Sequence, residues 1–242
     1  MMYRMSHVGF LSPDSICRSF DHRANGYARR EGVGTLILKS VSDAIRDADT
    51  MRAVVRGTGS NQNGHTPGMP VPGYKRQEQL IRSVYAQSGL KLEETAYVCR
   101  GSWYGDAVVG AVKSVIGHLE GASGLAGLIK TVFVLERGII PPNVKFEGVN
   151  PKIPAEKRHF QFPQVVMPRP GPGLRRAFVS SFGSRKEQLL RDAEPSVDQP
   201  DLSQDVSTVI QTSLIDLLCQ KNFHPHTKWL VVLRGEMPRP TV

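Results

Sequence analysis

A lysine and a histidine five positions apart are the residues of this sequence best placed to do chemistry. Lys113 and His118 lie in the stretch VVGAVKSVIGHLEGASGLAGLIK, residues 108–130. The apolar start of this stretch predicts a strand at 108–112, and the small and aliphatic residues after His118 predict a helix. Both side chains would then lie at the joint between a strand and a helix, where α/β proteins place their active sites. A neutral imidazole there could donate a hydrogen bond without being charged.

The elements expected around this joint follow the order of an α/β fold. An amphipathic pattern predicts a helix at 74–88, and Gly89 predicts its end. Ser40 or Ser42 is expected to cap a short helix at 40–48. Segment 57–73 is rich in glycine and proline and is expected to be a long loop. Strands are expected at 32–39, as a buried strand, and at 53–58, 95–99, 108–112 and 176–182.

Composition narrows the class of protein. The chain has 242 residues, of which 40% are hydrophobic, so it can bury a sizeable core. Its net charge of +9 comes from scattered Lys and Arg without a recognition motif, which favours a basic soluble protein over a nucleic-acid binder. Cys17, Cys99 and Cys219 are far apart and predict a reducing compartment. We expect a cytoplasmic chain without a metal site, because secretory, membrane-spanning and metal-ligand patterns are missing.

The sequence changes character near residue 184. Residues 185–204 are charged and polar, 206–219 have an amphipathic pattern that predicts a helix, and 229–233 are apolar. We therefore predict two regions, 1–183 and a divergent tail at 184–242. The tail is expected to be a separate small element or an extension.

The sequence contains five motifs in this order: SFDHRANGYARREGV, GTGSNQNGHTP, VGAVKSVIGHLEGASGLAGLIK, GIIPPNVKF and LRRAFVSSFG. Together they resemble the C-terminal half of β-ketoacyl synthase domains, in particular those of fungal highly reducing type I polyketide synthases. The resemblance covers about residues 5–183. It implies a partial thiolase-like fold, the C-terminal half of an αβαβα sandwich, and the joining of an acyl chain to a decarboxylated malonyl unit.

The resemblance also implies residue roles and partners. His118 matches the second family histidine, which stabilises the enolate of the malonyl thioester, and Lys113 matches the lysine that supports it. Asn61, Thr66 and Pro67 would line an acyl or pantetheine channel, with a purely structural loop as the alternative. No cofactor is expected to bind directly. The implied partners are acyl carrier protein and its phosphopantetheine thioesters, and either a second copy or a complementing ketosynthase half.

The departures from the family pattern concern its chemistry. No cysteine here has the Asp-Thr-Ala-Cys-Ser context of the family nucleophile, and CRGSWYGD stands where the first histidine motif, His-Gly-Thr-Gly-Thr, is expected. Arg30 replaces a usual glycine and Val115 a usual asparagine. The chain is therefore expected to be a ketosynthase remnant that is inactive alone. The alternatives are an acyltransferase subunit completed in trans by an N-terminal half, and a non-catalytic binding or dimerisation module.

Overall fold

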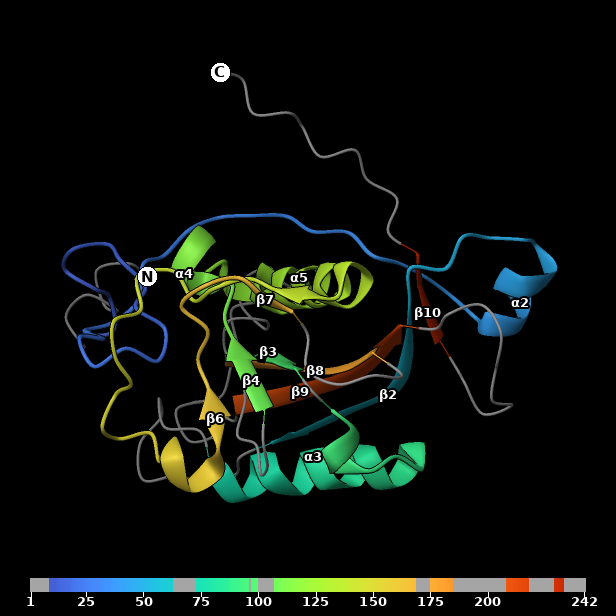
Figure 1. Cartoon of the computed structure of the whole chain (residues 1–242). Helices are drawn as coiled ribbons and strands as arrows, with labels where there is room; N and C mark the ends of the chain where they lie inside the picture. The colour runs from blue at the N-terminus through green and yellow to red at the C-terminus, as the bar shows by residue number, and fades with distance from the viewer. Residues whose placement is uncertain are drawn as a thin grey trace, which may run out of the picture.

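The computed structural model contains an eight-stranded mixed sheet with the strand order β1-β10-β2-β9-β8-β3-β4-β6 (Figure 1). In its parallel part, β3 (Tyr97–Cys99) pairs with both β4 (Ala107–Gly110) and β8 (Arg175–Ser184), and β4 pairs with β6 (Phe160–Gln161). This part positions the strand–helix joint. The structure describes residues 9–62, 73–95, 97–99, 107–168, 175–184, 208–217 and 229–232.

The other half of the sheet is antiparallel. It contains β1 (Ile37–Lys39), β2 (Ala53–Gln62), β9 (Thr208–Leu217) and β10 (Trp229–Val232). β9 lies between β2 and β8 and pairs with both along most of its length. A separate two-stranded sheet joins β5 (Ile139–Ile140) to β7 (Met167–Pro168).

Helices cover the two faces of the sheet: α3 (Tyr74–Ser88) packs on one and α5 (Ser123–Arg137) on the other (Figure 1). The side chains of β3 alternate between them, as the period of a strand requires. Tyr97 and Cys99 belong to the core beneath α5, whereas Val98 belongs to the core beneath α3. The sheet is therefore buried on both faces in its parallel half.

Local signals define the helix ends correctly. Ser40 accepts a hydrogen bond from the backbone N–H of Asp43 and caps α2 (Val41–Arg46), as expected. α3 spans the predicted residues, and Gly89 ends it with a φ of 64°.

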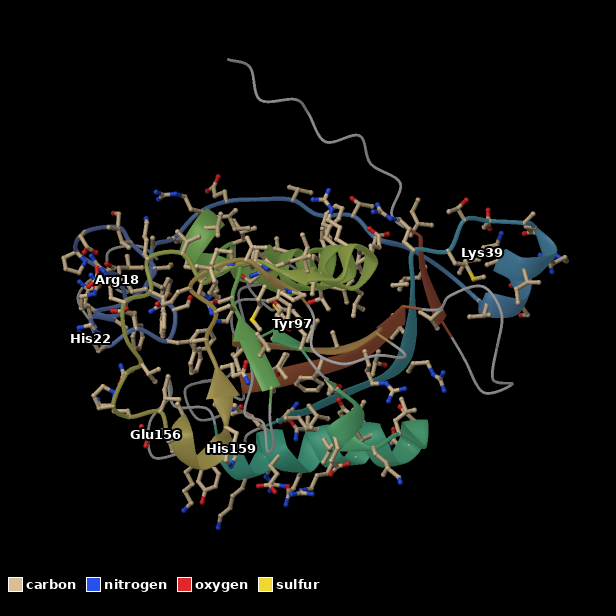
Figure 2. The ribbon with its side chains drawn as sticks, viewed as in Figure 1. Arg18, His22, Lys39, Tyr97, Glu156 and His159 are labelled. Atoms are coloured by element: carbon tan, nitrogen blue, oxygen red, sulfur yellow. The ribbon has the colours of Figure 1, made fainter. Side chains whose placement is uncertain are left out.

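Lys39, beside α2, and His22 in the N-terminal loop lie at opposite ends of the molecule (Figure 2).

Three expected elements were wrong. Only Ile37–Lys39 of segment 32–39 forms a strand, and it is an edge strand in which Leu38 is 55% exposed rather than buried. Strand β2 continues to Gln62, so the first part of the expected loop 57–73 is a strand. The helix predicted at 206–219 is strand β9, because pairing with β2 and β8 outweighs an ambiguous local pattern.

Two strands of the tail thus pair within the main sheet, although the division of the chain at residue 183 stays a prediction. No helix in the described part of the chain is long and apolar enough to cross a membrane.

Candidate functional site

The joint that contains His118 follows the carboxyl end of β4. Lys113 begins the short helix α4 (Lys113–Ile116), and Gly117 ends it with a φ of 78° before His118. A Cβ on Gly117 would lie 2.4 Å from Cγ of Arg30, so this turn requires glycine. His118 is partly buried, at the edge where parallel strands place their ligands.

The backbone of His118 is held by the N-terminal loop. Its N–H donates to the carbonyl of Ala28 at 2.7 Å, and its carbonyl accepts from the N–H of Arg30 at 2.9 Å. The Tyr27 ring lies against the imidazole, with 4.8 Å between ring centroids. Segment 27–30 therefore acts as a short strand that fixes where the histidine lies.

The imidazole has one defined tautomer. Nδ1 accepts a hydrogen bond from the backbone N–H of Glu120 at 3.0 Å and lies 3.0 Å from Oγ of Ser123. A backbone N–H can only donate, so Nδ1 has no proton and Nε2 is the N–H of the neutral ring. Ser123 is the first residue of α5, so the positive end of that helix faces the ring and favours its uncharged form.

We expect nitrogen-15 spectra to show His118 with a protonated Nε2 and an unprotonated Nδ1. The Ser123→Ala variant should keep this tautomer, since the Glu120 N–H still donates to Nδ1. The exposed His159 provides the reference signal in the same spectrum. A protonated Nδ1 in the neutral His118 ring would contradict the assignment.

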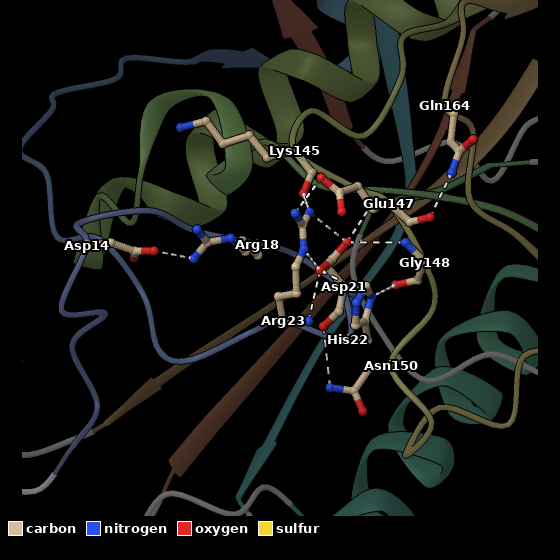
Figure 3. Close-up of polar contacts among 10 residues, drawn as sticks. All are labelled: Asp14, Arg18, Asp21, His22, Arg23, Lys145, Glu147, Gly148, Asn150 and Gln164. Atoms are coloured by element: carbon tan, nitrogen blue, oxygen red, sulfur yellow. Dashed lines mark hydrogen bonds and ion pairs between the residues drawn. The ribbon is translucent and has the colours of Figure 1, made fainter.

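The loop that holds His118 is anchored by a buried carboxylate (Figure 3). Asp21 is fully buried and accepts hydrogen bonds from the backbone N–H groups of Arg23, Glu147 and Gly148. The Arg23 guanidinium also donates to it, with Nε at 2.8 Å from Oδ1. These bonds, first among them the one from Arg23, hold the pKa of Asp21 far below its usual range.

The small residues in and just before α5 lie on two different sides of the helix. Cβ atoms added to Gly124 and Gly127 would lie 3.1 Å from Ser181 Oγ and 3.5 Å from a Val179 methyl group, so this face packs closely on the sheet of the same chain. Ala122 and Ala126 instead line an open apolar groove on the outer side of the helix.

The structure brings only some of the predicted site residues together. Lys113 and His118 flank one short helix, but Asn61 lies in β2, where its Nδ2 donates to the carbonyl of Arg76 in α3. Asn61 thus contacts the helix on the face of the sheet opposite α5. Thr66 and Pro67 lie outside the described residues.

Neither described cysteine is accessible. Cys17 is buried, and its sulfur accepts the Ala28 N–H at 3.0 Å. Cys99 is buried in β3, beside Tyr97, which lies in the interior (Figure 2). Burial, with Cys99 nearby, raises the pKa of Tyr97 well above its ordinary value. Cys219 lies outside the described residues.

Sequence reasoning missed the residues that hold His118. The contacts from Ala28, Arg30 and Asp21 join segments that are far apart in the chain, so no local pattern indicates them. Ser123 could have been found, because a hydroxyl five residues after His118 begins the predicted helix. No group of three or more His, Cys, Asp or Glu side chains that could hold a metal occurs within the described ranges.

Comparisons with known proteins agree with this architecture. Residues 100–147 match the family model "Beta-ketoacyl synthase, C-terminal domain", and residues 1–44 match "Beta-ketoacyl synthase, N-terminal domain". The ketosynthase from module 6 of the bacillaene synthase of Bacillus subtilis has a TM-score of 0.74 and 27% identity, covering 89% of this chain and 39% of that one. The oxazolomycin ketosynthase domain OzmH KS7 of Streptomyces albus has a TM-score of 0.75 and 25% identity, covering 92% and 40%. The predicted partial thiolase-like α/β fold is thus confirmed.

Fungal relatives are more similar in sequence. "Highly reducing polyketide synthase 40" of Fusarium mangiferae is 46% identical over 202 residues, or 74% of this chain. "Highly reducing polyketide synthase tazB" of Aspergillus terreus is 41% identical over 248 aligned residues, or 91% of this chain. The chain spans only 8% and 9% of the lengths of these two relatives. The chain therefore belongs to the β-ketoacyl synthase family, and its sequence is ketosynthase sequence of the kind found in fungal reducing polyketide synthases.

Proposed function

We propose that this chain derives from a polyketide ketosynthase that condenses acyl and malonyl thioesters, and that by itself it is inactive. In that reaction the malonyl thioester loses carbon dioxide, and the resulting enolate carbon attacks the acyl thioester and displaces its thiolate. The enolate oxygen needs neutral hydrogen-bond donors at fixed positions. The observation that supports the proposal is the fixed tautomer of His118, which leaves Nε2–H as the donor.

Among the described residues, no accessible thiol is available for the other half of the chemistry, the formation of the acyl-enzyme. An acyl-enzyme needs an accessible thiolate. Cys17 and Cys99 are buried with exposures of 6% and 3%, and the family cysteine and first-histidine motifs are missing from the sequence. In this proposal, Lys113 supports His118, whereas Asn61, Thr66 and Pro67 remain predicted contacts for the acyl or pantetheine group. The substrates would be thioesters on an acyl carrier protein.

The test is malonyl-thioester decarboxylation and condensation by the purified chain, with the His118→Ala variant as control. We expect both proteins to give only the uncatalysed rate. Turnover by the wild-type chain that is lost in His118→Ala would overturn the proposed inactivity and would show that the histidine still works.

A second candidate function is an acyltransferase subunit completed in trans, because the His118 geometry is intact although the nucleophile is missing. Adding a polypeptide that contains the cysteine and first-histidine motifs should then produce condensation that depends on His118. If no complex forms and no turnover appears, this candidate fails. A non-catalytic binding or dimerisation module would instead give a cooperative thermal melt with no activity in either experiment.

A further inference from the structure

Glu120 contacts the His118 ring through its own backbone. Its N–H donates to Nδ1 of the imidazole at 3.0 Å, and this hydrogen bond decides the tautomer. The Ser123 hydroxyl, also 3.0 Å from Nδ1, can either donate or accept, so by itself it allows both neutral forms of the ring. The direction of the Glu120 N–H therefore controls which nitrogen of His118 holds the proton.

The backbone of Glu120 has a conformation that needs support. Its φ is 50°, in the left-handed region, which is unfavourable for a residue with a Cβ. Such conformations persist only where surrounding contacts hold them. Glu120 also begins the short turn at Glu120–Ala122 that leads into α5. If its φ relaxed to a negative value, its N–H would turn away from the imidazole.

The Glu120 carboxylate supplies a contact that can hold this conformation. Its Oε1 lies 3.7 Å from Nε of Arg29. The Glu120 and Arg29 side chains are only 12% and 23% exposed, so solvent and salt screen this ion pair less than a pair on the open surface. The side chain of Glu120 is thus tied to the N-terminal loop.

Arg29 belongs to the segment that holds the His118 backbone. It pairs with His118 in a parallel β-bridge, between Ala28, whose carbonyl accepts the His118 N–H, and Arg30, whose N–H donates to the His118 carbonyl. Residues two positions apart on a strand lie on the same face, so Arg29 reaches Glu120, two positions after His118. One short segment therefore fixes the histidine backbone and, through its arginine, the residue that fixes the ring.

From these contacts we infer that Arg29 and Glu120 are positioning residues for His118. Their ion pair holds Glu120 in the left-handed conformation, which aims the Glu120 N–H at Nδ1 and keeps the proton on Nε2. The inference rests on the proposed role of Nε2–H as the donor to the enolate. It concerns the state of the ring, however, and its test needs no turnover.

Helix capping is the competing explanation for the Glu120 carboxylate. A carboxylate near the start of a helix is stabilised by the positive end of the helix dipole, without help from an arginine. In that case the His118 ring would not change when Arg29 is replaced. Arg29→Gln separates the two explanations, because it removes the charge of the partner and keeps the Glu120 side chain.

The experiment observes the His118 ring by NMR in the full chain labelled with nitrogen-15, at a pH that keeps the ring neutral. The wild type should show a coupling across the hydrogen bond between the Glu120 amide nitrogen and Nδ1, with the proton on Nε2. In Arg29→Gln the coupling should disappear. The ratio of the Nε2–H to the Nδ1–H tautomer should fall about fivefold, the effect of losing one hydrogen bond.

The matched control is Arg46→Gln, which breaks exposed ion pairs in α2. This helix lies at the opposite end of the molecule from α4 and the His118 joint (Figure 1). The coupling and the tautomer ratio of His118 should therefore stay as in the wild type.

Glycine at position 120 provides a rescue. Glycine adopts a positive φ about as readily as a negative one, so it needs no side-chain support there. Adding Glu120→Gly to Arg29→Gln should restore the coupling and raise the tautomer ratio again. Adding Glu120→Ala instead should restore neither, because alanine has no carboxylate and is unfavourable in the left-handed region.

Two results would overturn the inference. One is an unchanged coupling and tautomer ratio in Arg29→Gln, and the other is a loss in Arg29→Gln that Glu120→Gly does not reverse. If Arg29→Gln does not melt cooperatively, Glu120→Gln takes its place, and an unchanged ring in that variant would equally overturn it. Condensation is measured separately, so turnover by the wild-type chain would overturn the proposed inactivity and leave this inference standing.

Discussion

Replacing Asp21 by alanine is expected to reduce the free energy of unfolding by about 3–5 kcal/mol, the usual cost of breaking a buried ion pair. The carboxylate is fully buried, and its loss leaves the N–H groups of Glu147 and Gly148 without their acceptor. The Arg23 guanidinium loses its buried partner and keeps only the Glu147 carboxylate and the Lys145 carbonyl. Urea denaturation followed by circular dichroism measures the change. The Asp14→Ala variant is the control, because Asp14 is more exposed and, among the charged groups that the structure describes, pairs with Arg18 alone.

The pH dependence of stability provides an independent check on Asp21. Its folded-state pKa lies far below the ordinary value of 3.8, so its contribution is present above that value and is lost as the pH falls below it. The wild type should therefore lose stability in acid more steeply than Asp21→Ala. Two results would contradict the anchoring of the loop by this carboxylate. One is the same pH dependence of stability in the wild type and in Asp21→Ala, and the other is a loss of unfolding free energy in Asp21→Ala no larger than that in Asp14→Ala.

Gly26→Ala is the second substitution expected to have a large effect. It should reduce the free energy of unfolding by roughly 3–5 kcal/mol, because it strains the backbone and displaces neighbouring atoms. Gly26 has a φ of 133°, and a Cβ there would lie 2.6 Å from the backbone nitrogen of Ser12. The segment around Phe10 cannot move away easily, because its carbonyl accepts the Tyr27 N–H at 3.0 Å. The substitution should also shift the His118 signals, since residues 27–30 hold that histidine.

The matched control for this substitution is Gly89→Ala. Gly89 also has a positive φ, 64°, but nothing lies within 4 Å of its added Cβ. The free energy of unfolding of Gly89→Ala should therefore fall only by the cost of placing alanine in the left-handed region, about 1–2 kcal/mol. Thermal and urea melts of the two variants separate strain from collision. Similar losses of unfolding free energy in the two variants would mean that the backbone near Ser12 moves aside easily for the added Cβ.

Local patterns were enough to predict part of the fold. The residues of α3, its end at Gly89 and the serine cap of α2 follow from amphipathic spacing and from capping chemistry, which act within a few residues. The position of His118 between a strand and a helix followed in the same way, although the short helix α4 that precedes His118 was not expected. The fold class came from the order of these elements together with the family motifs.

Long-range contacts explain what the sequence did not reveal. Strand β9 was mistaken for a helix because its apolar residues fit either period, and only its partners β2 and β8 decide between the two. The anchoring of Asp21 joins residues separated by 126 positions.

The place of β9 in the sheet has a consequence for biosynthesis. In the described sheet, the ladder hydrogen bonds that connect strands β1, β2 and β10 to β8 and the parallel half run through β9, which is made after both β2 and β8. During vectorial synthesis on the ribosome, β2 and β8 must wait with open edges until residues 208–217 have emerged from the exit tunnel. Open strand edges pair readily with other chains. The edges of β2 and β8 are therefore open to other chains until β9 has been synthesised.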